Sequence, residues 1–166
     1  MFFIGIVSEL KEFETIKNNM KNSINVETLN IINLNKKNVM NFQNITFDTV
    51  VLMENLDKWN DDVKYLEEII RKARYLLVNA DIRLRKEILM EIKIKVITFG
   101  FNLKSTVLVS SVLDDKILID LQRSIVNVNN ILFDSGGKYF PIKNKMTVYD
   151  ALVIFILEIL YKKSVN

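Results

Sequence analysis

The first hundred residues alternate short apolar runs with amphipathic segments, and this alternation limits the folds open to the chain more than any other feature. Short apolar runs bounded by polar clusters are typical of buried strands, whereas apolar residues at every third or fourth position indicate a helix packed on one side. Where the two alternate, the strands pair in parallel and helices cover both faces of the sheet. We therefore expect a three-layer α/β fold with a mostly parallel sheet.

The pattern before Gly100 predicts five strands and three helices. The strands are expected at residues 2–7, 26–34, 47–53, 75–78 and 96–99, and the helices at 9–20, 61–72 and 83–92. Ser8 is placed to cap the first helix. The apolar spacing predicts that this helix turns four side chains toward the sheet, namely Leu10, Phe13, Ile16 and Met20.

The alternation of apolar runs with amphipathic segments stops after Gly100. Short strands are expected at 106–112, 116–121, 124–133 and 139–142, with turn signals at 114–115 and 135–137. Because such short connections leave no room for a crossover, we expect antiparallel hairpins. The last helix, at 147–162, is apolar nearly all round and should be buried on several sides, and with its neighbours it is a candidate surface for self-association. Residues 1–166 are expected to form a single domain.

The sequence contains no His and no Cys. These absences exclude a His-based catalytic triad, a thiolate nucleophile and metal sites built from His or Cys. We therefore expect no catalytic residues, no metal and no cofactor, and we favour a chain that is not an enzyme. The apolar run at 2–7 lacks the charge order of a signal peptide, and the longest apolar run, 151–157, is too short to span a bilayer. These features predict a cytoplasmic protein without a membrane span.

Residues 71–104 carry nine basic and three acidic side chains, although the whole chain has a net charge of only +3. A basic segment can meet the phosphates of a nucleotide or a nucleic acid, or it can be the solvated face of helices. Aromatic residues are few in this segment, which contains only Tyr75, Phe99 and Phe101. Because stacking platforms for bases need more aromatic side chains, we do not expect nucleic-acid binding.

Three polar residues follow predicted strands: Glu54, Asn79 and Asp81. The carboxyl ends of parallel strands meet at the crevice where α/β proteins bind ligands, so these residues are the candidates for ligand binding. Two structural interpretations stay open beside this one. Glu54 can face solvent, and Asp81 can cap the helix near Arg83 while Asn79 holds the turn. Residues 135–138 look like a phosphate loop but lack a following helix, so they are predicted to be a turn.

Four stretches, in order along residues 47–160, resemble the central nucleotide-binding domain of the Mur ligases, which add amino acids to peptidoglycan precursors. Residues 47–54 resemble the strand that ends in a metal-associated Glu, and 77–81 are similar to the strand that ends in Asn-x-Asp-Asp. Residues 96–101 look like the next strand and turn, and 147–152 lie where His-Asn-x-x-Asn-Ala opens the last helix. The resemblance implies a Rossmann-like, P-loop-like domain and a ligand-binding role for Glu54, Asn79 and Asp81.

The departures from that family concern its chemistry. The phosphate loop ending in Gly-Lys-Thr is missing, and Glu9 and Glu12 stand where a polyphosphate needs cations. Ile82 replaces the second Asp of the strand motif, and Asp150 replaces the Asn of the last helix. The hypothesis is a non-catalytic Mur-ligase-like domain, acting as a scaffold or interaction protein in cell-wall or envelope processes, as a homo-oligomer or with a protein partner. The alternative is a small nucleotide- or phosphometabolite-binding enzyme that uses the strand-end carboxylates.

Overall fold

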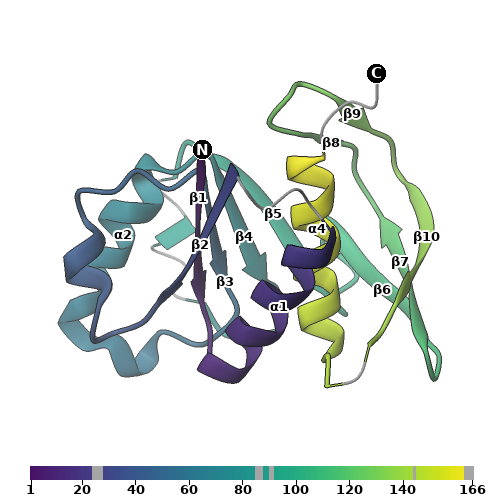
Figure 1. Cartoon of the computed structure of the whole chain (residues 1–166), viewed down its shortest axis with the longest axis horizontal. Helices are drawn as coiled ribbons and strands as arrows, with labels where there is room; N and C mark the ends of the chain where they lie inside the picture. Colours follow the sequence, from purple (N-terminus) through teal and green to yellow (C-terminus); the bar gives the residue numbers. More distant parts are fainter. Residues whose placement is uncertain (24–27, 85–87, 90–91, 144, 163–166) are drawn as a thin grey trace.

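One eight-stranded sheet forms the centre of the computed structural model, which describes residues 1–23, 28–84, 88–89, 92–143 and 145–162 (Figure 1). The strand order is β10-β7-β6-β5-β4-β3-β1-β2, and β8 and β9 form a separate two-stranded sheet. The strands are β1 Phe2–Val7, β2 Leu29–Leu34, β3 Thr49–Leu52, β4 Tyr75–Asn79, β5 Lys95–Gly100, β6 Val107–Val112, β7 Lys116–Leu121, β8 Ile125–Val126, β9 Leu132–Phe133 and β10 Gly136–Pro141. The expected α/β class and the mostly parallel sheet are confirmed.

Strands β1 to β6 run parallel, and the order in which successive strands are placed across the sheet reverses at β1. Strand β2 lies on one side of β1, whereas β3, β4, β5 and β6 follow on the other. Every residue of β3 and β4 is buried, as expected for strands covered on both faces. In such sheets the crevice between the strands that flank the reversal, here β1 and β3, is the usual place for a ligand.

The first connection after Gly100 corrects one sequence expectation. Strand β6 lies parallel to β5, with Phe99 opposite Val107 and Gly100 opposite Leu108. Because β6 starts level with the end of β5, the chain continues in the same direction and needs no return crossover. The antiparallel expectation is confirmed for β6 with β7, β7 with β10 and β8 with β9. The strand expected at 124–133 is in fact β8 and β9, separated by a turn.

Helices cover both faces of the sheet (Figure 1). Helices α1 (Leu10–Ser23) and α4 (Val148–Tyr161) share one hydrophobic core with the strands, whereas α2 (Val63–Lys72) and the 3-10 helices η2 (Val39–Phe42) and η3 (Asp57–Asp62) share the other. In α1, Phe13, Ile16 and Met20 are buried as expected, but Leu10 is 66% exposed. Leu10 lies in the first turn, beyond the end of β1, where no layer covers it. Of the helix expected at 83–92, residues 85–87 and 90–91 lie outside the described residues, and 88–89 are helical.

Helix α4 is buried on nearly all sides, which confirms the expectation for the last helix. Figure 1 shows it between the parallel half of the sheet and β10. A register shift between Val109 and Ser111 bends β6 against β7, and Phe140 of β10 meets the ring of Phe155 at 5.7 Å. The apolar side chains of α4 are thus covered within the chain, and the helix itself offers no broad face for self-association.

No helix among the described residues combines the length and the apolar character that crossing a bilayer requires.

Candidate functional site

The carboxyl ends of β1, β3, β4 and β5 meet at one edge of the sheet, called the carboxyl edge below. Glu54 lies there, two residues after β3, and its Oε1 accepts a hydrogen bond of 3.2 Å from Nε1 of Trp59. Trp59 belongs to η3 and is buried in the core on the α2 face of the sheet. Glu54 is half-buried, so its carboxylate is held toward the α2 layer rather than freely solvated.

Asn79 and Asp81 form one structural unit at the end of β4. The Oδ1 of buried Asn79 accepts the N–H of Asp81 at 3.0 Å, which gives Asn79 the turn-holding role left open by the sequence. The Asp81 carboxylate accepts the N–H groups of Phe101 at 2.7 Å and Asn102 at 3.0 Å, and the hydroxyl of Tyr149 at 3.0 Å. Its described partners therefore lie in the loop after β5 and on α4, not in a helix near Arg83.

The structure brings only two of the three candidates together. Asn79 and Asp81 are adjacent and bonded, whereas Glu54 contacts η3 in one layer and Asp81 contacts α4 in the other. Within the described part of the chain, no three Asp or Glu side chains are grouped closely enough to hold a metal ion. A two-carboxylate site made of Glu54 and Asp81 is therefore not formed by these contacts.

Two carboxylates that the sequence did not single out as site residues lie where the first turns of α1 and α4 approach one another. Asp150 is 1% exposed, and its Oδ2 accepts the N–H of Thr147 at 2.8 Å, while its Oδ1 is buried without a hydrogen-bond partner in the described structure. Burial raises the pKa of Asp150, an effect opposed by its hydrogen bonds with Thr147 and by the charge of Lys11. The pKa of Glu12 is also raised, first by burial and then by the charge of Asp150.

Smaller repulsions from Glu9 and Glu54 act on Glu12 in the same direction. Glu12 therefore lies near three acidic groups whose charges oppose its own ionisation. We call these four residues, Glu9, Glu12, Glu54 and Asp150, the acidic edge. Asp150 was noted in the sequence only as a replaced Asn, and its proximity to Glu12 has no local sequence signal because the two lie on different helices.

The connection from β1 to α1 is short and contains no glycine. Strand β1 ends at Val7 and α1 begins at Leu10, so only Ser8 and Glu9 lie between them. The buried Ser8 hydroxyl donates to the carbonyl of Glu9 at 3.1 Å, rather than accepting a helix N–H as a cap would. Gly5 lies inside β1, where a Cβ atom would meet the Leu34 side chain at 2.5 Å, so this glycine allows close packing of the core and is no part of a loop.

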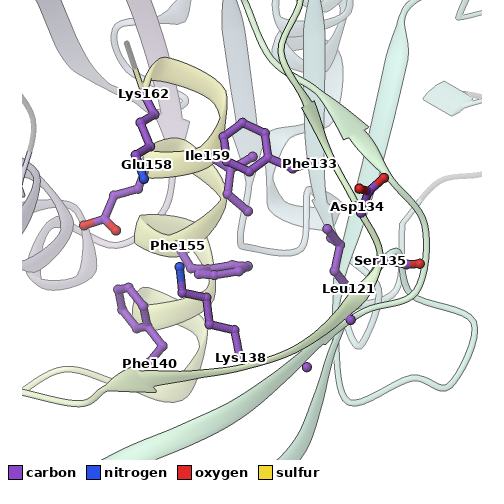
Figure 2. Close-up of a pocket in the computed structure, with 12 residues that line it drawn as sticks. Leu121, Phe133, Asp134, Ser135, Lys138, Phe140, Phe155, Glu158, Ile159 and Lys162 are labelled. Carbon is purple, nitrogen blue, oxygen red and sulfur yellow. The ribbon is translucent and has the colours of Figure 1, made fainter. Parts of the chain in front are cut away.

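A cavity of about 340 Å³ lies away from the carboxyl edge, between α4 and β10 (Figure 2). Its apolar wall comes from Leu121, Phe133, Phe140, Phe155 and Ile159, and charged side chains of both signs surround it. In Figure 2 the Lys138 side chain runs beside Phe140 and Phe155 toward the helix. The turn predicted at 135–138 is corrected here, because residues 136–138 belong to the edge strand β10.

The basic segment does not form one patch in the described residues. Arg74 and Lys95 lie at the amino ends of β4 and β5, whereas Lys104 follows the carboxyl end of β5. These cations are therefore at opposite ends of the sheet, which fits a solvated surface better than a continuous track for a nucleic acid.

No protein-family model matches the sequence, and no curated protein matches it. Among solved structures, the constitutive lysine decarboxylase of E. coli is similar over 63% of this chain, with 12% sequence identity and a TM-score of 0.37. This chain spans 15% of the length of that decarboxylase chain. A sequence identity and a TM-score this low assign no activity to this chain.

Proposed function

We propose that this chain is a non-catalytic domain of the Mur ligase central-domain type, which serves cell-wall or envelope processes in the cytoplasm by binding a protein partner or a second copy of itself. The observation that supports the proposal is the acidic edge, which occupies the place where a nucleotide-binding α/β domain holds phosphate. The resemblance of four stretches of the sequence to that family supports the proposed relationship to it.

Phosphate binding at the start of a helix depends on free backbone N–H groups and nearby cations. At the start of α1 the chain offers Glu9 and Glu12, and the side chain of Asp150 lies close by. A triphosphate placed here would meet three carboxylates and one lysine, Lys11, so both charge and side-chain bulk oppose its binding. The alternative enzyme is weakened by Asp81, whose carboxylate already serves three donors.

Thermal unfolding with and without millimolar ATP and Mg²⁺ tests the proposal. We expect an unchanged Tm, because a ligand that is not bound cannot stabilise the fold. Binding at about 100 times Kd would add roughly 2.7 kcal/mol. For a chain of this size that corresponds to an increase of about 5–10 °C in Tm.

A matched variant makes the result sharper. If charge alone kept ATP away, Glu9→Lys would replace a carboxylate by a second cation near Lys11 at the start of α1 and produce a measurable ATP-dependent shift. We expect no shift in this variant either, because the β1–α1 connection lacks a glycine cradle. An ATP-dependent shift in the unmodified chain, or ATP hydrolysis by the purified protein, would reject the non-catalytic proposal.

A further inference from the structure

Strand β5 has an open edge along its first half. The N–H of Lys95 donates to the carbonyl of Arg74, and the carbonyl of Phe99 accepts the N–H of Ala80, so the peptide groups of these residues face β4. Successive residues of a strand face opposite neighbours, so the peptide groups of Val96 and Thr98 face the β6 side. The β6 ladder begins only at Phe99, and no other described strand pairs with β5 at Val96. The peptide groups of Val96 are therefore left without a partner strand, whereas β6 approaches at Thr98, whose hydroxyl accepts the N–H of Thr106 at 2.9 Å.

A cavity of about 320 Å³ lies beside this open edge. It is bounded by Val96 and Ile97 of β5, by Thr106 at the start of β6, and by the segment 123–126 that follows β7. Tyr75 contributes to its lining, and the fully buried ring is fixed by a hydrogen bond of 2.9 Å from its hydroxyl to the carbonyl of Val126. The volume lies in the range of sites that hold small ligands or single peptide residues.

The charges at this cavity are of one sign. Lys95 and Arg123 line it, and no Asp or Glu is among its described lining residues. The Lys95 ammonium lies 5.5 Å from the centroid of the Tyr75 ring, and the Arg74 guanidinium lies 5.4 Å from the same ring. Asp48, the nearby acid on the β3 side, accepts the backbone N–H of Phe3 at 2.9 Å and belongs to another contact. The cavity therefore favours an anionic ligand.

We call the cavity and the adjoining open edge of β5 at Val96 the slot. We propose that the slot binds the carboxyl-terminal end of an extended peptide, which adds to the open edge and places its terminal carboxylate between Lys95 and Arg123. Addition of a strand to a free sheet edge uses the backbone for affinity and neighbouring pockets for specificity. A simple anion would satisfy the two cations and leave the strand edge unpaired, whereas a peptide satisfies both. The buried side chains of Ile97 and Ile125 give the last residue of the peptide an apolar contact. The inference rests on the proposed function, because it specifies the kind of protein partner.

The test is a titration of the ¹⁵N-labelled full chain, followed by NMR, with acetyl-Ala-Ala-Val-Val ending in a free carboxylate and with the same peptide ending in an amide. We expect the acid to shift the amide signals of Val96 and Thr98, and the amide-ended peptide to bind about tenfold more weakly or worse, since it lacks the charge-assisted contacts. Equal affinity for the two peptides, or shifts confined to other strands, would overturn the proposal. Inorganic phosphate or acetate binding as tightly as the peptide would overturn it too, because the strand edge would then contribute nothing.

Two variants and one control connect the binding to the slot. Lys95→Gln and Arg123→Gln should each weaken the acid about fivefold, the scale of one partly exposed charge contact. Lys104→Gln removes an exposed cation from the loop after β5, outside the slot, and should leave the affinity unchanged. Equal losses of affinity in all three variants would indicate general electrostatic attraction and reject the proposed binding at the slot.

Titrating the same sample with ATP and Mg²⁺ separates the two proposals. A missing peptide response rejects only the binding at the slot, whereas an ATP response at Ser8 and Glu54 rejects the proposed function.

Discussion

Asp81 is an exposed residue that nevertheless connects three parts of the chain. Its carboxylate accepts two backbone N–H groups of the loop after β5 and the hydroxyl of Tyr149 on α4. Gly100, which precedes this loop, has a φ of +141° and a Cβ at this position would collide with the Asp81 carboxylate. Both features explain why glycine ends β5: the backbone conformation is unfavourable for other residues, and the space is taken.

Replacing Asp81 by Asn tests this structural role. The variant keeps the size of the side chain but loses the charge and one acceptor oxygen, so we expect a loss of about 1–3 kcal/mol in the free energy of unfolding. Urea unfolding monitored by the fluorescence of Trp59, the single tryptophan, measures it. Asp114→Asn, in the exposed β6–β7 turn, is the control and should change stability by less than about 0.5 kcal/mol. Equal stability of the two variants would contradict the structural role of Asp81 in connecting these parts of the chain.

At the scale of elements, α4 is defined at its start by a reciprocal pair of hydrogen bonds. The Thr147 Oγ1 accepts the N–H of Asp150 at 3.1 Å, and Asp150 returns the bond by accepting the N–H of Thr147 at 2.8 Å. This capping box fixes where the helix begins. The position matters because α4 is apolar on nearly all sides, so its apolar pattern alone favours no rotation or start point strongly over another.

The cap therefore contributes a measurable share of stability. Thr147→Ala should lower the free energy of unfolding by about 1 kcal/mol, as is typical for the loss of an N-cap side chain. Thr147→Ser, which keeps the hydroxyl oxygen, should retain most of that stability. Chemical denaturation of the two variants side by side is the measurement, and an alanine variant as stable as the serine variant would argue against the cap.

The sequence predicted most elements well because the evidence for each is local. Apolar runs located β1, β3, β4 and β5 to within about two residues at each end, the usual uncertainty of element boundaries. The parallel placement of β6 was missed because it depends on how far one strand extends past another, which no local pattern encodes. The split of 124–133 has a local cause in Asn127, whose buried Oδ1 accepts the N–H groups of Asn129 and Ile131 and closes a turn.

The candidate site, like the fold, could be predicted from the sequence only in part. Parallel strand ends share an edge by necessity, so the sequence correctly directed attention to Glu54, Asn79 and Asp81. It could not show that Asp81 is occupied by donors from distant segments, or that Glu12 and Asp150 meet across two helices. Those facts arise only when the helices are packed on the sheet.

At the scale of the whole molecule, two carboxylates of the acidic edge, Glu12 and Asp150, oppose the fold at neutral pH. Glu12 and Asp150 have pKa values raised in the folded chain, mainly by burial. Such groups bind protons more readily when folded than when unfolded, so stability falls as the pH rises through the interval between the unfolded and folded values. Above that interval the destabilisation stays constant. Tolerance of this effect is consistent with a role for the edge other than packing.

Glu12→Gln should relieve part of this effect. The variant removes a partly buried titrating group whose ionisation the Asp150 charge opposes, so we expect it to gain stability relative to the unmodified chain as the pH rises above 4.5, the ordinary pKa of a Glu carboxyl. Urea midpoints measured from there to about pH 7 give the difference. Glu14→Gln, an exposed position on the same helix, serves as the control. A difference between Glu12→Gln and the unmodified chain that does not change with pH would contradict a raised pKa of Glu12 in the folded chain.

The central position of α4 also has a consequence for biosynthesis. One face of the sheet is covered by α1 and by residues 148–161, and the latter are translated after all ten strands. Translation adds about 5–20 residues per second, so a nascent chain that already contains the strands exposes part of this apolar face until the helix has been synthesised. Emergence of the helix from the ribosomal exit tunnel should therefore be the event that commits the chain to its folded state, and stalling the ribosome before it should leave a species that chaperones recognise.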